Sequence, residues 1–412
     1  MARQVFVKNF DHFTDRSTAK ISGKHEWMNK MITSLNGSEW KKLRSTISPT
    51  FSTKKMKNMF TIIDGIIENF IKQMEEVSKD NEKVDVKECY NRFSLDVIGA
   101  SAFGIECDTL AKDPVFLKRA AELFTFNAMK VIRILIFLVL PMKVINFLRI
   151  PVVDDGFTYF KRISETTLEQ RRKLEAKRGD FIDLMLDEQE KQKNDFDEDK
   201  NFKICDDTIL ATSVLFIIAG NENIANLLTF SSYYLAKDET CQNTLRKEIE
   251  DIIEKDGELN YHNIMEAKYL DACLSETLRL NSVLLLERVC TKDFQFPGVN
   301  GLKIEKGSSV NVGIHALHLD PEYWPDPEKY NPERFLPENK HSVLPGTYLP
   351  FGIGPRNCIA MRFALMEAKI CMAKMTMKFK LSLAPGHEEL KVQPFTRAPI
   401  KGSVKIIMEP LE

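Results

Sequence analysis

The sequence predicts a mainly α-helical (α+β) protein that also carries small β-sheets. Apolar residues recur at helical spacing over several long stretches, which is the main signal for helices. Segments that alternate between apolar and polar residues, as strands do, are short and lie in the last third of the chain. The helical stretches are 54–77, 86–103, 157–174 and 206–238, and the alternating ones are 288–293, 304–307 and parts of 380–412.

Composition excludes several classes of function. The 412 residues include 58 basic and 59 acidic side chains, so the net charge near zero gives no support for nucleic acid binding. The eight cysteines are scattered without a Cys-x-x-Cys pair, which indicates a reducing compartment and argues against a zinc site or a disulfide framework. His315 and His318 are close in sequence, but no acidic motif accompanies them, and we expect no metal there.

The N-terminal segment is mixed in character and predicts neither a signal peptide nor a membrane span. The most apolar run, 132–148, is interrupted by Arg133, Pro141 and Lys143 and is too short to cross a bilayer. It is either a core segment or an interfacial loop that dips into lipid. The charge-rich stretch 185–201 is expected to link helices, with nothing to mark a domain boundary.

A helix is predicted to follow the turn Asn36-Gly37-Ser38, with Ser38 as its N-cap. Trp40 and Arg44 are four residues apart and therefore project from one face of this helix. An indole N–H beside a guanidinium suits an anionic group such as a cofactor carboxylate, although a surface cation–π contact is the alternative.

The stretch 206–238 is the longest helical pattern, and it is apolar almost all round between Ile209 and Ala219, as in a helix through the middle of a protein. Gly220 costs roughly 1 kcal/mol relative to alanine inside a helix, so a close approach or a bend is expected there. Glu222 beside it is a carboxylate in apolar surroundings, which is costly unless it is hydrogen-bonded or functional.

The loop from Phe351 to Cys358 contains two glycines and a proline, which make a tight and restricted turn. Apolar residues at helical spacing follow it from Phe363 to Met377. At the start of a helix, free backbone N–H groups and the helix dipole favour the thiolate of Cys358 over the thiol. Arg356 adds a guanidinium that can pair with a carboxylate on whatever the sulfur binds.

This loop resembles the haem-thiolate loop of the cytochrome P450 monooxygenases, Phe-x-x-Gly-x-Arg-x-Cys-x-Gly, with Ala360 in place of the last glycine. The Trp-x-x-x-Arg, Ala-Gly-x-Glu, Glu-x-x-Arg and Pro-Glu-Arg-Phe motifs also occur, in the order found in that family. The sequence is most similar to the microsomal families that include the vertebrate 3A drug-metabolising enzymes and arthropod detoxification enzymes.

The resemblance implies the cytochrome P450 fold, in which a long central helix and a helix bundle surround the haem beside small β-sheets. It also implies a single catalytic domain over residues 1–412, without the N-terminal membrane anchor, the hinge and the first helix and strands of the family.

The resemblance also implies a role for each motif. The residues expected to bind haem b are Trp40, Arg44, Ala219, Phe351, Arg356 and Cys358, of which Cys358 would be the axial thiolate ligand of the iron. Arg288 is a weaker candidate for contact with a haem propionate. Glu276, Arg279 and Arg334 would form a buried network that fixes the chain next to the cysteine loop.

The main departure from the family is Asn223, which stands where threonine is usual after Ala-Gly-x-Glu. Glu222 would manage protons and Asn223 would contact oxygen, but an amide is a poor proton relay. The leading prediction is a monooxygenase that inserts one atom of dioxygen into a lipophilic small molecule. The alternatives are a haem-thiolate isomerase or peroxygenase that acts on peroxides, and a catalytically impaired haem-binding protein.

The implied partners are NADPH–cytochrome P450 reductase, cytochrome b5 as a further electron donor, and a membrane surface. The implied location is the cytoplasmic face of the endoplasmic reticulum membrane. The wall of the substrate pocket is expected to differ from the family, because 281–286 lacks the usual proline and is one residue short. A C-terminal hairpin with its tip near Phe395 would reach the substrate.

Overall fold

In the computed structural model, the described residues are 1–17, 20–21, 23–80, 83–104, 155–173, 180–194, 202–283, 285–296, 301–390 and 402–411, with a few between 118 and 145. The helices are α1 (Gly37–Ile47), α2 (Thr53–Asp80), α3 (Val86–Ile98), α8 (Asp155–Lys173), α9 (Phe181–Asn194), α10 (Asp206–Lys237), α11 (Glu239–Asp256), α12 (Tyr261–Glu266), α13 (Lys268–Leu280), α14 (Ile314–His318) and α15 (Met361–Lys378). Short 3-10 or π-helical segments are η1 (Gln4–Lys8), η2 (Phe10–His12), η3 (Gly23–Lys30), η4 (Ser48–Phe51), η5 (Gly99–Phe103), η6 (Pro332–Phe335) and η7 (Lys340–Ser342). The mainly helical fold class is confirmed.

The strands form small antiparallel sheets. They are β1 (Val84–Asp85), β2 (Leu285–Val289), β3 (Phe294–Gln295), β4 (Lys303–Ile304), β5 (Ser309–Gly313), β6 (Phe379–Leu383) and β7 (Lys405–Pro410). The sheets have the orders β1-β7-β6, β2-β5 and β3-β4. The strands predicted at 288–293 and 304–307 agree with the structure only in part. Strand β2 ends at Val289, and the turn at Gly307 (φ +91°) separates β4 from β5.

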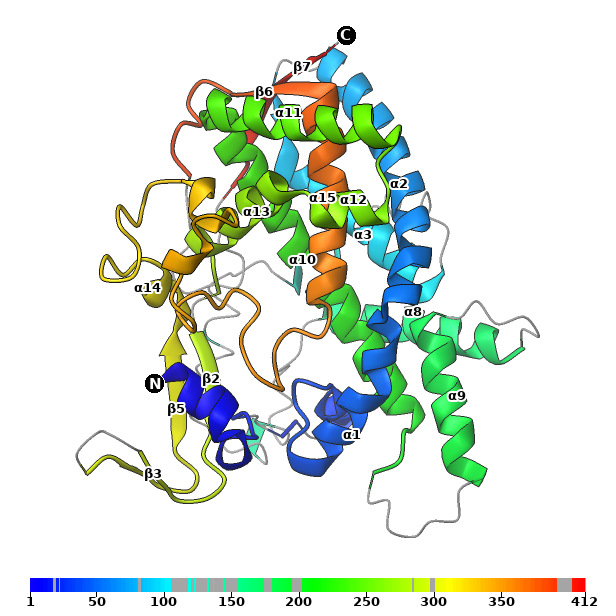
Figure 1. The fold of residues 1–412 in the computed structure, drawn as a ribbon. Helices are drawn as coiled ribbons and strands as arrows, with labels where there is room; N and C mark the ends of the chain where they lie inside the picture. The colour runs from blue at the N-terminus through cyan, green and yellow to red at the C-terminus, as the bar shows by residue number, and fades with distance from the viewer. Residues whose placement is uncertain are drawn as a thin grey trace.

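Helix α10 runs through the middle of the molecule, with α3, α15 and α13 around it (Figure 1). Its N-terminal half packs in one apolar cluster with α1, α8 and α9, and its C-terminal half packs in another with α2, α3 and α15. In the described part of the chain, α10 is the one helix long and apolar enough to cross a membrane, but 67% of its most apolar window is buried.

The local expectations for the helices hold in most places. The apolar face predicted for 54–77 is buried in α2. A Cβ on Gly220 would lie 2.9 Å from Cδ1 of Ile98, so glycine permits the close approach of α10 to α3. Helix α3 ends at Ile98 and continues as the π-helical η5. Most of the run 132–148, the connector residues 195–201 and Phe395 lie outside the described residues.

Candidate active site

The cysteine loop, Phe351 to Cys358, is closed on itself and leads into α15. The N–H of Cys358 donates to the carbonyl of Phe351 at 2.8 Å, and the N–H of Asn357 donates to the carbonyl of Gly354 at 3.0 Å. Gly354 has a φ of +78°, and a Cβ there would lie 1.9 Å from the carbonyl oxygen of Phe6 in η1. Glycine at this position therefore lets the loop seat against the N-terminal segment.

The environment of Cys358 contains groups that favour the thiolate, but they do not prevail. Part of the residue is exposed to solvent, but the surrounding protein atoms shield the thiol from much of the water. This burial raises the pKa of Cys358, while the backbone N–H of Ala360 and the charge of Arg44 lower it. The backbone N–H at the helix start acts in the expected direction, but burial outweighs it. A metal bound to the sulfur is what would deprotonate it.

Helix α1 docks on the cysteine loop through the two residues predicted to act together. Arg44 donates from Nη1 to the carbonyl of Asn357 at 2.8 Å and from Nη2 to its Oδ1 at 3.0 Å. Trp40 is buried and stacks on the guanidinium of Arg356, with 4.2 Å between the guanidinium carbon and the ring centroid. The structure thus brings Trp40, Arg44 and Arg356 together beside Cys358.

Arg356 is buried, and only some of its hydrogen-bond donors have partners among the described residues. Its Nη2 donates to the carbonyl of Leu35 at 2.8 Å and to Oδ1 of Asn36 at 3.2 Å. Its Nε is buried and has no hydrogen-bond partner among the described residues. Burial, with a smaller contribution from Arg16, lowers the pKa of Arg356 to about 10.

Arg288 on β2 is a second buried cation. It is 0% exposed, and its Nη1 donates to the carbonyl of Glu287 at 2.6 Å. Its Nε and Nη2 lack hydrogen-bond partners within the described ranges. Burial, together with Arg16 and Arg356, lowers the pKa of Arg288 to about 9. Its guanidinium lies 5.0 Å from the ring centroid of Phe6.

Two buried guanidinium groups, each with a donor that has no partner among the described residues, make a site for an anion. A buried charge is costly unless it is paired, and neither Arg288 nor Arg356 forms an ion pair with a carboxylate of the described residues. A cofactor that offers a soft metal to a thiol and carboxylates to guanidiniums would satisfy the whole donor set. Haem has both groups, so the residues fit it.

Helix α10 offers one exposed patch in an otherwise buried middle section. Ala219 and Asn223 are both exposed and lie one turn apart, and Nδ2 of Asn223 donates to the carbonyl of Ala219 at 2.8 Å. Glu222 is only 6% exposed and accepts a hydrogen bond from Nδ2 of Asn226 at 3.2 Å. Burial raises the pKa of Glu222, against smaller opposing effects of Lys87 and Asn226.

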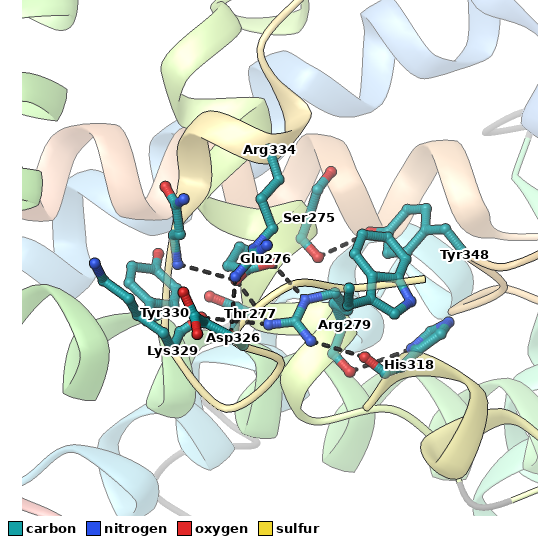
Figure 2. A network of polar contacts seen from close by, with 12 residues as sticks. Ser275, Glu276, Thr277, Arg279, His318, Asp326, Lys329, Tyr330, Arg334 and Tyr348 are labelled. Atoms are coloured by element: carbon teal, nitrogen blue, oxygen red, sulfur yellow. Dashed lines mark hydrogen bonds and ion pairs between the residues drawn. The ribbon is translucent and has the colours of Figure 1, made fainter. Parts of the chain in front are cut away.

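Glu276, Arg279 and Arg334 meet in a buried network between α13 and the segment around η6 (Figure 2). The carboxylate of Glu276 accepts from Nε and Nη2 of Arg279 at 2.7 and 2.8 Å, and from Nε of Arg334 at 3.4 Å. Nη1 of Arg279 donates to the carbonyl of His318 at 2.7 Å.

His318 extends this network to the cysteine loop. Its Nε2 accepts from the backbone N–H of Leu349 at 2.8 Å, so its Nδ1 carries the proton and faces the carbonyl of Arg279 at 3.2 Å. Burial is the main reason that the pKa of His318 is lowered to about 4. The neutral imidazole therefore joins α13 to the residues just before Phe351.

Comparisons with known proteins agree with this geometry. The Cytochrome P450 family model matches residues 1–406. The chain is 37% identical over 422 residues to cytochrome P450 3A2 of Rattus norvegicus, covering 100% of this chain and 79% of the relative. It is 36% identical over 411 residues to cytochrome P450 9e2 of Blattella germanica, covering 93% and 76%. It is 34% identical over 405 residues to cytochrome P450 6a2 of Drosophila melanogaster, covering 96% and 80%.

The resemblance to vertebrate 3A and arthropod enzymes is thereby confirmed, and the chain belongs to the cytochrome P450 family: it is an oxidoreductase, a haem monooxygenase whose cofactor is haem b with a cysteine thiolate as the axial ligand of the iron.

Proposed function

We propose that this enzyme inserts one atom of dioxygen into a lipophilic small molecule and that Cys358 is the axial ligand. The observation that carries the assignment is the Cys358 thiol, exposed on a closed loop, together with two buried guanidinium groups, Arg356 and Arg288, each with a donor that lacks a partner among the described residues. When haem is bound, its iron supplies the oxygen chemistry, since an electron-rich thiolate ligand favours O–O cleavage.

The surrounding residues hold and orient the cofactor. Arg356 and Arg288 bind its propionates, because each has a buried N–H that lacks a partner among the described residues. Trp40 supports Arg356 by stacking on it. Arg44 uses both Nη groups on Asn357, so it fixes the loop and favours the anionic form of Cys358, in addition to any contact with a propionate. Phe351 closes the loop through its carbonyl.

Glu222 and Asn223 divide the proton chemistry on α10. Glu222 is buried, and because burial raises its pKa it holds a proton more readily than an exposed carboxyl group and can pass it on. Asn223 faces outward and contacts oxygen, but its amide donates to the carbonyl of Ala219 and passes no proton on.

A peroxygenase is the second candidate, and the amide of Asn223 favours it, because a peroxide substrate needs less proton delivery. Turnover with reductase and NADPH should be compared with turnover on a hydroperoxide, in the wild type and in Asn223→Thr. We expect the threonine variant to put a larger share of its electrons into product and less into hydrogen peroxide. Full coupling in the wild type with reductase would exclude the peroxide route.

The chain is proposed to form a single cytochrome P450 catalytic domain over residues 1–412, since the family model matches 1–406. Its electrons come from NADPH–cytochrome P450 reductase, with cytochrome b5 as a further donor. Helix α1, which docks on the cysteine loop, exposes Lys41 and so offers positive charge to an acidic partner on this side. The proposed location is the cytoplasmic face of the endoplasmic reticulum membrane, by analogy with the 3A relatives.

The test is the reduced carbon monoxide difference spectrum. The wild type should show a strongly red-shifted Soret band, which reports a thiolate ligand, and Cys358→Ala should lose it. Cys205→Ala is the matched control, because Cys205 is also exposed and lies at the start of α10 away from the loop. Absence of the band in the wild type, or its survival in Cys358→Ala, would overturn the assignment.

A further inference from the structure

Asn36 stands at the N-cap of α1 but does not cap it. Its backbone is extended, with φ −126° and ψ 167°, and its side chain makes no hydrogen bond to the first turn of the helix. An asparagine in this position ordinarily accepts from the N–H of the second or third helical residue. The N-cap is therefore Asn36 and not Ser38, and the amide is engaged elsewhere.

The amide of Asn36 forms a two-way pairing with the backbone of Arg16. Its Oδ1 accepts from the N–H of Arg16 at 3.1 Å, and its Nδ2 donates to the carbonyl of Arg16 at 3.1 Å. The same Oδ1 accepts from Nη2 of Arg356 at 3.2 Å. One side chain thus joins the start of α1, the N-terminal segment and the cysteine loop.

The segment held by Asn36 also pairs with the strand that carries Arg288. The carbonyl of Asp15 accepts from the N–H of Val289 at 2.8 Å, and Oδ1 of Asp15 accepts from the N–H of Gly37 at 2.9 Å. The backbone at residues 15 and 16 is therefore fixed between α1 and β2. Arg288 and Arg356 come from segments that both contact this junction.

The junction gathers like charges. Burial is the main cause that lowers the pKa of Arg44, Arg288 and Arg356, and repulsion by Arg16 lowers each of them further, while the charge of Asp15 raises that of Arg356. Repelling cations move apart unless the backbone holds them, and an uncharged amide can hold Arg356 without neutralising it. A carboxylate in the same place would form a charge-assisted bond with Arg356 and compete with any other anion.

We infer that Asn36 is a positioning residue for cofactor carboxylates: it fixes Arg356 and the Arg16 segment around their site, and its side chain has to remain uncharged. This inference rests on the proposed function, in which Arg356 binds a haem propionate.

The test measures the rate of haem transfer from the holoenzyme to excess apomyoglobin. Asn36→Asp is nearly isosteric, but it loses the bond to the Arg16 carbonyl and pairs with Arg356, so haem loss should accelerate by about tenfold or more. Asn36→Ala removes the hydrogen bonds to Arg16 and Arg356 without adding a charge, so it should accelerate haem loss less than Asn36→Asp does. Asn29→Asp is the matched control, because Asn29 pairs in the same two-way manner with the backbone of Ile21, at 2.9 and 2.6 Å.

Arg356→Gln separates failure of this inference from failure of the proposed function. If Asn36 acts through Arg356, Asn36→Asp should accelerate haem loss much less in the Arg356→Gln background than in the wild type. An equal effect in both backgrounds, an Asn29→Asp effect of the same size, or an Asn36→Ala effect as large as that of Asn36→Asp would overturn the inference. Normal haem retention in Asn36→Asp, with fast loss in Arg356→Gln, would overturn it and leave the proposed function intact. Normal retention in Arg356→Gln would overturn the inference together with the assignment of Arg356 to a propionate, and the carbon monoxide spectrum would still test Cys358 separately.

Discussion

Arg288 should affect the haem-free and haem-loaded proteins in opposite directions. It is fully buried, and this burial is the main cause that lowers its pKa from the ordinary value of an arginine to about 9. At about 1.4 kcal/mol per pKa unit, this difference corresponds to roughly 5 kcal/mol of unfavourable free energy for holding the charge in the folded chain. The penalty is fully present below pH 9 and is relieved as the pH rises above 9, because the unfolded chain keeps the proton to a higher pH than the folded chain.

Arg288→Met removes this charge and keeps an unbranched side chain that can pack on Phe6. The change forfeits a hydrogen bond to the Glu287 carbonyl and a cation–π contact, together about 2 kcal/mol. The haem-free variant should therefore be about 2–3 kcal/mol more stable than the wild type. The haem-loaded variant should lose its haem faster, since a propionate loses its partner.

Urea unfolding of the haem-free proteins at pH 7 and haem transfer from the loaded proteins measure the two effects. Arg279→Met is the control, because Arg279 is also 0% exposed but is fully engaged with Glu276 and the His318 carbonyl. Its loss leaves a buried carboxylate and should cost about 3–5 kcal/mol. If haem-free Arg288→Met is destabilised as much as Arg279→Met, the reasoning that Arg288 lacks an anion in the haem-free state is refuted.

Three other substitutions probe the network and the loop. Glu276→Ala leaves Arg279 and Arg334 without their carboxylate partner and should give protein without bound haem. Normal haem content per chain would contradict this. The pKa of His318 is about 4 in the folded state, below its usual 6.5, so the unfolded chain takes up the proton first as the pH falls. Stability should therefore be lost between pH 6.5 and about 4, by about 3 kcal/mol, and His318→Gln should flatten that slope in unfolding measured across this range. Gly354→Ala should lower both the melting temperature and the haem content, because its Cβ would meet a backbone oxygen at 1.9 Å. Gly386→Ala, at φ +84° in open space, should cost only about 1–2 kcal/mol, and an equal loss in both would show that the close approach does not matter.

The features predicted well from the sequence are those that depend only on residues close together in the chain. The periodicity of α2 and α10, and the glycines of the cysteine loop, determine local structure without reference to the rest of the chain. Gly220 predicts a close approach or a bend, and only the structure shows that it is a close approach, with Ile98 as the neighbour. Local rules therefore found where an unusual packing contact occurs, but not what it touches.

The features that were missed depend on segments far apart in sequence. Arg44 donates to Asn357, which lies 313 positions away, so no pattern around Arg44 indicates that partner. Arg288 looks like an ordinary polar position in an alternating strand, and its burial follows from packing against Phe6 and the N-terminal segment. The N-cap was assigned to Ser38 because capping propensity ignores the competing bonds that Arg16 and Arg356 offer to Asn36.

Arg288 and Arg356, which form no ion pair within the described part of the chain, link cofactor binding to the folding of the N-terminal segment. The apolar cluster beneath them is small, formed by Val5, Phe6, Phe13, Cys290, Phe294 and Phe296. It has to hold the cysteine loop, β2 and residues 15–16 together against the cost of burying Arg288 and Arg356 without an anion. A ligand that binds only the folded arrangement stabilises it, and more so the higher its affinity. Haem carboxylates would therefore offset the free energy of burying the two guanidinium groups. The N-terminal segment should then gain more protection from hydrogen exchange on haem binding than α11, which lies outside this junction.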